Sequence, residues 1–208
     1  RRQPVDFLQS QHFFTNLYAV VCARLTGCRD IGAIRNDATS EVSGLGWLAG
    51  TASLRWPRTL AANSTRAIHN AVSLGRASRF IFFLPNVVDT RFFIPPDQPA
   101  SSPLHVIAAG RLVRQKRFDR LVRVVRRLPH HLLTRIQVSL IGDGPEREQL
   151  QQMIVAEGLN DVIQMLPARD DLLSAYQSAH LLMLTSDHEG TPNVILEAMS
   201  CGLPILAT

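Results

Sequence analysis

Two glutamates in the last part of the chain carry the first chemical signal. Glu189 and Glu197 are separated by seven residues in the segment EGTPNVILE. Carboxylates accept hydrogen bonds from sugar hydroxyls, and a pair of them is also the machinery of glycoside hydrolysis, which needs one acid and one nucleophile or base. The pair therefore indicates a carbohydrate ligand and leaves binding and hydrolysis as alternatives.

The residues between the two glutamates predict the start of a helix. Thr191 is placed to cap it and Pro192 suits its first position, so the expected helix covers Pro192–Ser200. The backbone amides around Asn193 and Val194 then have no partner within the helix, and together with the helix dipole they favour an anion such as phosphate. A hydrolase does not need an anion site, so a sugar joined to a phosphate fits better. An ordinary capped helix with a solvated glutamate is the alternative without function.

A second signal is cationic. The segment GRLVRQK begins at Gly110, directly after an expected strand, and contains Arg111 and Lys116, the single lysine among 22 cationic residues. A guanidinium offers a planar fork and an ammonium a point charge, and both suit a diphosphate whose leaving charge must be neutralised. The segment therefore predicts a diphosphate site at the end of a strand.

The same cations also permit simpler interpretations. Between Arg111 and Arg127 the chain has eight cations and one acid, Asp119. Such a helix can be merely solvated, can lie on an anionic membrane surface, or can bind nucleic-acid phosphates. Its one aromatic residue, Phe118, sits on the apolar face and offers no stacking platform for bases, which argues against nucleic acid.

The second half of the chain alternates between short apolar runs and amphipathic runs. This alternation predicts a parallel sheet with helices on both faces, in which ligands bind at the carboxyl ends of the strands. Gly110, Gly142 and the loop Ser186–Thr191 fall at those ends. The expected strands are Leu104–Ala109, Ile136–Ile141, Val162–Leu166, His180–Thr185 and Pro204–Ala207, and the expected helices are Arg117–Leu128, Pro145–Glu157, Asp170–Ser178 and Pro192–Ser200.

The first half predicts a smaller lobe. Its expected strands are Val5–Leu8, Gly32–Ile34, Thr59–Ser64 and Ile81–Leu84, with a helix at Phe14–Leu25. The proline-rich segment 95–103 is typical of a linker, so we expect a lobe over residues 1–94, a linker over 95–103 and a second lobe over 104–208. Five or six strands are usual in a complete open sheet, so the first lobe is expected to be partial.

Composition narrows the class of protein. The chain has 208 residues, of which 46% are hydrophobic and 19% charged, and no apolar run approaches the ~18 residues of a membrane span. Cys22, Cys28 and Cys201 have no CxxC spacing and are expected to be buried, reduced thiols of a cytosolic protein. The seven histidines show no metal-ligand spacing, so no metal is expected. The net charge of +5 falls on residues 1–98, which have eleven arginines against six acids.

At this point the chain resembles a known family, the retaining family 4 glycosyltransferases. These enzymes have the GT-B architecture, an α/β fold of two Rossmann-like lobes with parallel sheets. The resemblance covers nearly the whole chain, and the last segment contains the E-x7-E signature of the family. The matching segments are NSTRAIHNAVSLG, LPNVVDTRFF, AAGRLVRQKRFDRLV, LIGDGPEREQL and EGTPNVILEAMSCGLPILAT.

The resemblance implies an activity and a donor. The chain would transfer a sugar from a UDP- or GDP-linked donor to a saccharide or lipid-linked acceptor with retention of anomeric configuration. Arg111 and Lys116, beside Gly110, would hold the donor diphosphate and stabilise it as a leaving group. These two cations would take the place of a metal, so no metal or other cofactor is expected.

The resemblance also implies roles for the acidic segment. Glu189 would bind hydroxyls of the donor sugar, and Gly190–Val194 would present backbone amides to the sugar and the phosphate. Glu197 would bind the ribose. A catalytically incomplete fragment that only binds nucleotide sugars, and a basic peripheral membrane or nucleic-acid binder, are the alternatives.

One family residue is displaced here. Family members usually have a histidine after the strand that Val5–Leu8 resembles, and ungapped spacing from Asp6 places Gln11 there, with His12 one residue later. We carry the role over to His12. The resemblance further implies that the N-terminal lobe is partial, that the C-terminal lobe is nearly complete, and that both ends are truncated. It implies a cytoplasmic protein, in peripheral contact with the anionic cytosolic face of a membrane.

Overall fold

A computed structural model describes residues 5–98 and 103–208. The chain divides into two compact units: unit 1 contains the residues up to Asn86 together with Glu189–Thr191, and unit 2 contains Val87–His188 and Pro192–Thr208. The expected linker over 95–103 lies partly outside the described residues. The short segment Glu189–Thr191 therefore belongs to unit 1 by its contacts, although its neighbours in sequence belong to unit 2.

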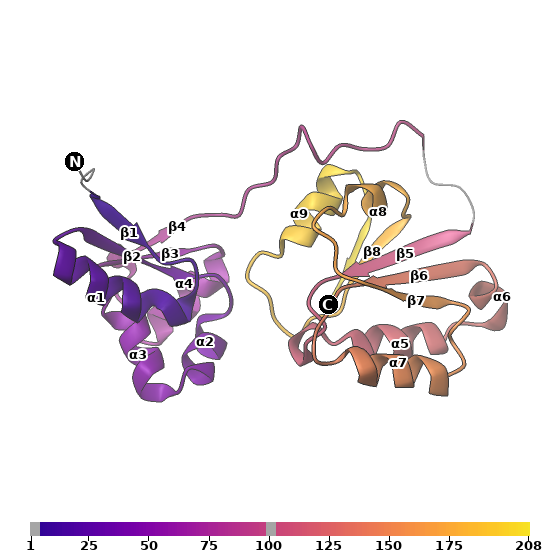
Figure 1. Ribbon diagram of the computed structural model, residues 1–208, viewed down its shortest axis with the longest axis horizontal. Helices are drawn as coiled ribbons and strands as arrows, with labels where there is room; N and C mark the ends of the chain where they lie inside the picture. Colours follow the sequence, from indigo (N-terminus) through magenta and orange to yellow (C-terminus); the bar gives the residue numbers. More distant parts are fainter. Residues whose placement is uncertain (1–4, 99–102) are drawn as a thin grey trace. The chain divides into compact units, whose positions relative to one another are not determined.

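Unit 1 contains a parallel sheet in which the strands follow one another in sequence order, β1-β2-β3-β4 (Figure 1). Its strands are β1 (Phe7–Gln9), β2 (Arg29–Ile34), β3 (Thr59–Ala62) and β4 (Ile81–Phe83). Its helices are α1 (Asn16–Thr26), α2 (Ala38–Gly44), α3 (Trp47–Arg55) and α4 (Thr65–Ser73), with single 3-10 turns at η1 (Phe13–Thr15) and η2 (Ser78–Phe80).

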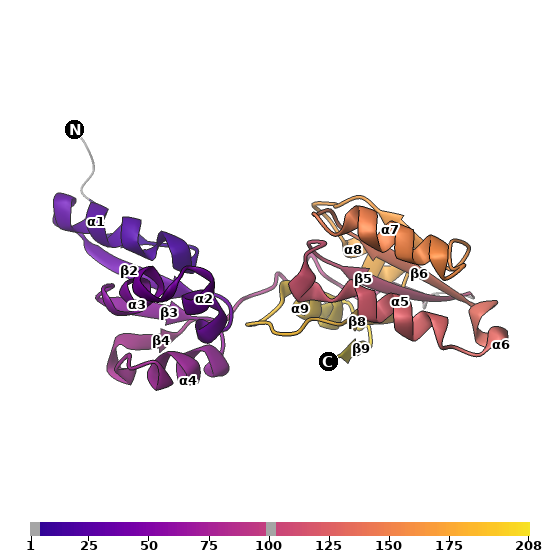
Figure 2. The ribbon, with the colours of Figure 1, turned by 90° about the horizontal axis from the view of Figure 1, so that it is seen from below.

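All four helices of unit 1 lie on one face of its sheet (Figures 1 and 2). Crossovers between parallel strands are right-handed, so a sheet that grows in one direction receives every connecting helix on the same side. Ile34, Leu60 and Ala62 point to that side and form its core with residues of α2, α3 and α4. On the other side Phe7 and Phe82 stay 56% and 40% exposed, and no helix among the described residues of unit 1 covers them.

A close backbone approach fixes two of these helices. Gly50 of α3 is buried against the backbone of α2, and a Cβ atom at this position would overlap the Val42 carbonyl group. Asp37 caps α2 by accepting hydrogen bonds from the backbone N–H groups of Thr39 and Ser40, each at 3.0 Å. The segments of α2 and α3 have no strong apolar periodicity, and a helix cap and a close contact at a glycine stabilise them as helices.

Unit 2 contains a parallel sheet with a different strand order, β7-β6-β5-β8-β9. The order reverses at β5, so chain segments leave the middle of the sheet in both directions. Its strands are β5 (Leu104–Ala109), β6 (Ile136–Ile141), β7 (Ile163–Leu166), β8 (Leu181–Leu184) and β9 (Ile205–Ala207).

The helices of unit 2 cover both faces of that sheet (Figure 1). They are α5 (Phe118–Arg126), α6 (His130–Leu133), α7 (Arg147–Ala156), α8 (Leu173–Gln177) and α9 (Asn193–Ser200), with a 3-10 turn at η3 (Arg114–Lys116). Alternate residues of β5 enter opposite cores: Val106 and Ala108 pack with α5 and α7, whereas Ile107 packs with α8 and α9. The expected α/β fold with parallel sheets is confirmed.

Two expectations need correction. Cys28 and Cys201 are buried, but Cys22 is exposed on α1, so the expectation of three buried thiols is wrong. The predicted elements of the first half include only one of its four helices; α2, α3 and α4 were not expected. In the part of the chain that the structure describes, no helix has both the length and the apolar character needed to cross a membrane.

Candidate functional site

The first group of candidate residues lies at the carboxyl end of β5, beside the point where the strand order reverses. Gly110 follows the strand, and the Lys116 side chain folds over it: Cε and Nζ lie 3.5 and 3.8 Å from the position that a Cβ atom of Gly110 would take. Arg111 is exposed in the same segment. In doubly wound sheets such a reversal opens the crevice in which ligands bind, so these residues occupy the place expected of a binding site.

The loop after β8 is fixed to the same segment by hydrogen bonds. Thr185 donates its hydroxyl to the Lys116 carbonyl at 2.9 Å, and the Asp187 N–H donates to the Gln115 carbonyl at 2.9 Å. The Gln115 amide in turn donates to the His188 carbonyl at 2.7 Å. The ends of β5 and β8 therefore form one connected surface beside the reversal.

Part of the basic helix is used to hold that surface. Arg117 contacts Asp119 at 3.0 Å and Asp187 at 3.1 Å, and Arg120 contacts Asp187 at 2.6 Å. The hydrogen bond from Arg117, followed by the charges of Arg117 and Arg123, holds the pKa of Asp119 below its usual value. These arginines pair with carboxylates of the fold, which reduces the charge available for a membrane or a nucleic acid.

The turn after β6 has a structural reason for its glycines. A Cβ atom at Gly142 would overlap the Gly110 carbonyl, and one at Gly144 would lie 2.5 Å from the Leu112 carbonyl oxygen. The Leu112 N–H donates to the Asp143 carbonyl at 2.9 Å, which brings the two loops together. The GDG segment therefore shapes the loop that contains Gly110.

Helix α9 begins one residue later than expected. Its N-cap is Pro192 and its first residue is Asn193, and no described side chain caps it. The expected cap by Thr191 is wrong, because Thr191 lies one residue before the N-cap position and its hydroxyl bonds to the Asn63 carbonyl. Val194 packs against a small core that contains Ala109, the last residue of β5. The first turn of α9 therefore lies beside the strand end that leads into Gly110.

Glu197 is held by a residue that the sequence does not single out. The Tyr176 hydroxyl of α8 donates to Glu197 Oε2 at 2.8 Å, and Tyr176 is only 1% exposed. Burial, followed by donation to Glu197, raises the pKa of Tyr176 well above its usual value, so the phenol stays protonated. Burial and the charge of Glu197 raise the pKa of the Cys201 thiol as well. Glu197 thus has one oxygen fixed by the fold.

Glu189, Gly190 and Thr191 rest on the carboxyl edge of the sheet in unit 1. Asn86 donates to the Thr191 carbonyl at 2.6 Å, and the Thr191 hydroxyl donates to the Asn63 carbonyl at 2.8 Å. Asn63 comes directly after β3 and Asn86 comes three residues after β4, so polar residues that follow buried strands are the signal in the sequence that could have indicated this edge.

His12 follows β1 at the same edge of unit 1. It is exposed, and its ring stacks on Phe14 with the centroids 5.3 Å apart. The Thr15 hydroxyl donates to the His12 carbonyl at 2.7 Å, so the backbone of His12 forms a tight turn before α1. The assignment of a catalytic role to His12 stays a prediction.

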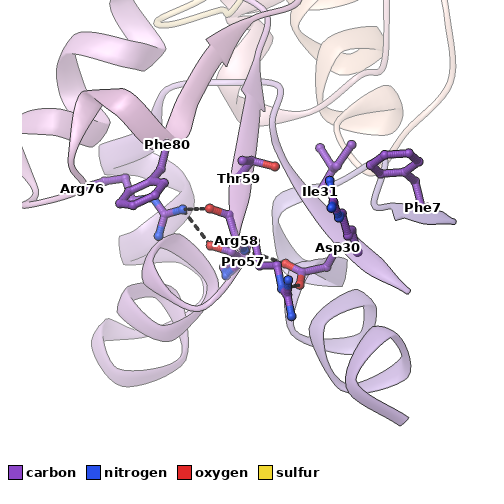
Figure 3. Close-up of a pocket in the computed structure, with 9 residues that line it drawn as sticks. Phe7, Asp30, Ile31, Pro57, Arg58, Thr59, Arg76 and Phe80 are labelled. Carbon is purple, nitrogen blue, oxygen red and sulfur yellow. Dashed lines mark hydrogen bonds and ion pairs between the residues drawn. The ribbon is translucent and has the colours of Figure 1, made fainter. Parts of the chain in front are cut away.

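Unit 1 also has a cavity of about 640 Å³ at the amino ends of its strands (Figure 3). Arg76, 8% exposed, donates to the carbonyl groups of Arg55, Pro57 and Arg58 at 2.6–3.0 Å, and Asp30 accepts the Arg58 N–H at 2.7 Å. Burial lowers the pKa of Arg76. Arg76 and Asp30 therefore bind backbone groups of residues 55–58 and hold that segment before β3 in place.

Within residues 5–98 and 103–208, no three acidic, histidine or cysteine side chains gather in a way that could hold a metal ion. The candidate residues that the sequence predicted lie instead at the carboxyl edges of the two sheets.

Comparisons with known proteins agree with the fold. Residues 90–208, more than half of the chain, match the family described as "Glycosyl transferases group 1". The chain is 32% identical to the lipopolysaccharide core biosynthesis glycosyltransferase LpsE of Rhizobium meliloti over 112 residues, which are 54% of this chain and 31% of that protein. It is 26% identical to LpsD of the same organism over 203 residues, which are 98% of this chain and 47% of that protein.

A solved structure is similar over nearly the whole chain. The Anabaena protein HepE in complex with UDP-glucose matches with a TM-score of 0.84 at 19% identity, covering 97% of this chain and 59% of that one. This likeness confirms the expected GT-B-like fold. The chain spans less than half the length of the two curated relatives.

Proposed function

The chain belongs to the group 1 glycosyl transferases, and we propose that it is part of a retaining, metal-independent enzyme that transfers a sugar from a UDP- or GDP-linked donor to a saccharide or lipid-linked acceptor. One observation carries the proposal. Lys116 folds over Gly110 at the reversal of the sheet in unit 2. The preceding residue, Ala109, belongs to the small core against which Val194 of the first turn of α9 packs, and Tyr176 fixes Glu197 of the same helix. A cation and the start of a helix together suit a diphosphate.

Each candidate residue has a defined part in this proposal. Lys116 and Arg111 neutralise the diphosphate, Glu197 accepts hydrogen bonds from the ribose, and Glu189 accepts them from the donor sugar. The acceptor hydroxyl attacks the anomeric carbon on the face that the diphosphate leaves. The bond from that carbon to the phosphate oxygen breaks with its electron pair going to the diphosphate, and the departing oxygen takes the proton.

The competing basic-surface interpretation has less support. Arg117, Arg120, Arg123 and Arg126, half of the eight cations in the basic run, form ion pairs with Asp119, Asp187 or Glu157. A cytoplasmic location with peripheral contact at the membrane face stays part of the proposal, as does a saccharide or glycolipid acceptor.

Titration calorimetry with UDP-glucose and GDP-mannose tests the donor site in this chain. We expect one of the two to bind, and Lys116→Met to weaken it at least about tenfold, because a charge-assisted contact to phosphate is lost. The matched control is Arg126→Gln, which breaks only the surface pair with Glu157 and should bind like the wild type. Equal binding by both variants would remove the basis of the proposal.

Transfer itself is tested in the full-length enzyme. Glu189→Ala should abolish transfer, and addition of a chelator should leave the wild-type rate unchanged. Unaltered turnover by Glu189→Ala would contradict the assignment. Donor binding without any transfer by the wild type would favour the alternative of a nucleotide-sugar-binding fragment.

A further inference from the structure

Arg117, between the turn η3 and the helix α5, has a left-handed backbone conformation, with φ 50° and ψ 42°. Among the residues that the structure describes, it is the one non-glycine residue with a positive φ. A side chain disfavours this conformation, so contacts elsewhere must hold it. We infer that Arg117 is a positioning residue, whose left-handed backbone places Lys116 over Gly110. Asp119 and Asp187 hold it in that conformation.

The Arg117 side chain is held by two carboxylates. Its Nε donates to Asp119 Oδ1 at 3.0 Å and its Nη2 to Asp119 Oδ2 at 3.2 Å, which is a bidentate pair. Its Nη1 donates to Asp187 Oδ1 at 3.1 Å. Asp187 is fixed in turn, because its N–H donates to the Gln115 carbonyl at 2.9 Å. Contacts to α5 on one side and to the loop after β8 on the other therefore offset the cost of the left-handed backbone.

The conformation of Arg117 sets the direction of the chain at Lys116. A right-handed residue at this position would let η3 and α5 run on as one helix, whereas the left-handed residue separates them. The Lys116 N–H donates to the Val113 carbonyl and its carbonyl accepts the Thr185 hydroxyl, both at 2.9 Å. With its backbone fixed in this way, Lys116 Cε lies 3.5 Å from the position that a Cβ atom of Gly110 would take.

The inference lies within unit 2 and rests on the proposed function, because it takes Lys116 as a cation that neutralises the donor diphosphate. The guanidinium of Arg117 is already paired with Asp119 and Asp187. The inference therefore adds that Arg117 serves the donor site through its backbone conformation, and its charge serves to maintain that conformation.

Two substitutions at this position separate backbone from charge. Arg117→Ala and Arg117→Gly both remove the guanidinium and its ion pairs, but only glycine adopts a positive φ readily. The chain is titrated with UDP-glucose or GDP-mannose, whichever the wild type binds. We expect Arg117→Ala to weaken binding about 5–10-fold, the cost of a left-handed residue, and Arg117→Gly to recover most of that loss. Arg126→Ala is the matched control, because it removes an arginine and its pair with Glu157 from a right-handed position of α5.

A double substitution shows whether Arg117 acts through Lys116. Lys116→Met removes the side chain that Arg117 is inferred to place, so adding Arg117→Ala to it should weaken binding by less than about twofold. A general loss of structure, or a direct contact between Arg117 and the donor, would instead lower the affinity by the same factor in both backgrounds.

The placement of Lys116 can also be measured without a donor. Lys116 is the single lysine of the chain and is half-buried. An amine-reactive reagent therefore labels its side chain and the amino terminus, which peptide mass spectrometry distinguishes. Arg117→Ala should speed the labelling of Lys116 at least about threefold, because the side chain is released from its place, and Arg117→Gly should label like the wild type.

The outcomes are distinct. If the wild type binds neither nucleotide sugar, the proposed function fails, whereas the labelling rates still decide whether Arg117 places Lys116. If the wild type binds one of them, and the alanine and glycine variants behave alike in both measurements, the inference alone is overturned.

Discussion

The two units cover their parallel sheets with helices in different ways. Unit 1 winds its sheet in one direction and covers one face with four helices, whereas unit 2 reverses at β5 and covers both faces. In doubly wound sheets ligands bind at such a reversal, because the loops on either side of it leave in opposite directions. The described strands of unit 1 show no reversal, and the carboxyl edge of that sheet instead contacts Glu189–Thr191, which lies more than a hundred residues further along the sequence.

The difference shows what positions the candidate residues in each unit. In unit 2 the candidate residues are placed by strand ends and by glycine turns that allow loops to touch. In unit 1 hydrogen bonds from the Asn86 amide and the Thr191 hydroxyl hold the segment Glu189–Thr191 in place. We expect a destabilising substitution in one unit to leave the other unit folded. Both tryptophans, Trp47 and Trp56, lie in unit 1, so tryptophan fluorescence reports the unfolding of unit 1 alone.

The largest expected effects come from a methyl group added at a close backbone contact. Gly50→Ala would force α2 and α3 apart in unit 1, and Gly142→Ala would force the loops at Gly110 apart in unit 2. Each should lower the unfolding free energy of its own unit by about 3 kcal/mol or more. Urea unfolding followed by tryptophan fluorescence should shift only for Gly50→Ala, while circular dichroism should shift for both. Identical shifts in both signals would show that the units unfold as one.

A pH dependence should distinguish the units next. Burial, with the charge of Asp37 adding to it, raises the pKa of Glu41 in α2 from 4.5 to about 7. The folded unit 1 therefore favours the protonated carboxyl, and its stability should fall as the pH rises from about 4.5 to 7, by about 1–2 kcal/mol once solvent screening of this half-buried group is allowed for. The tryptophan-detected urea midpoint should drop over this range, and Glu41→Gln should flatten it. A flat wild-type profile would contradict the expectation.

Unit 2 should show a smaller effect at the alkaline end. Because the pKa of Tyr176 is raised by burial and by Glu197, the folded state keeps a proton that the unfolded chain loses near pH 10. Stability detected by circular dichroism should decline above that pH, less steeply for Tyr176→Phe. At neutral pH this variant should lose about 1 kcal/mol, the value of one hydrogen bond. If it also binds the nucleotide sugar as well as the wild type does, Tyr176 does not help to place Glu197.

The smallest effect is expected at an exposed ion pair. Arg126 and Glu157 join α5 to the end of α7 at 3.2 Å, with more than a third of each side chain exposed. Arg126→Gln should change the unfolding free energy of unit 2 by less than about 0.5 kcal/mol. A loss above 1 kcal/mol, measured in low and high salt, would show that the basic helix contributes more than its surface position suggests.

The sequence predicted unit 2 better than unit 1 for a physical reason. A strand buried on both faces is a continuous apolar run, so Leu104–Ala109 and Ile136–Ile141 match β5 and β6 at both ends. Helices α2 and α3 contain serine, threonine and glycine at positions where apolar residues would indicate a helix. The Asp37 cap on α2 and the close backbone contact at Gly50 stabilise them instead.

The residues of the candidate site also differ in how well the sequence predicts their contacts. Gly110 and Lys116 are close in sequence, so their association could be predicted from one motif. Tyr176 and Asn63 contact residues 21 and 128 positions away, Glu197 and Thr191 respectively, and no periodicity within the chain encodes such pairings. Their signal was limited to a polar residue after a buried strand and a tyrosine on an otherwise apolar helix face.

The three cysteines allow the local opening of each unit to be measured from the rate at which its buried thiol is alkylated. Cys22 on α1 is open to a maleimide at once, whereas Cys28 of unit 1 and Cys201 of unit 2 are 9% and 2% exposed. A buried sulfur reacts only when its surroundings open, so the rates at which the second and third thiols become alkylated measure the opening free energy of each half under native conditions. One mass spectrum per time point would follow both without any engineered label.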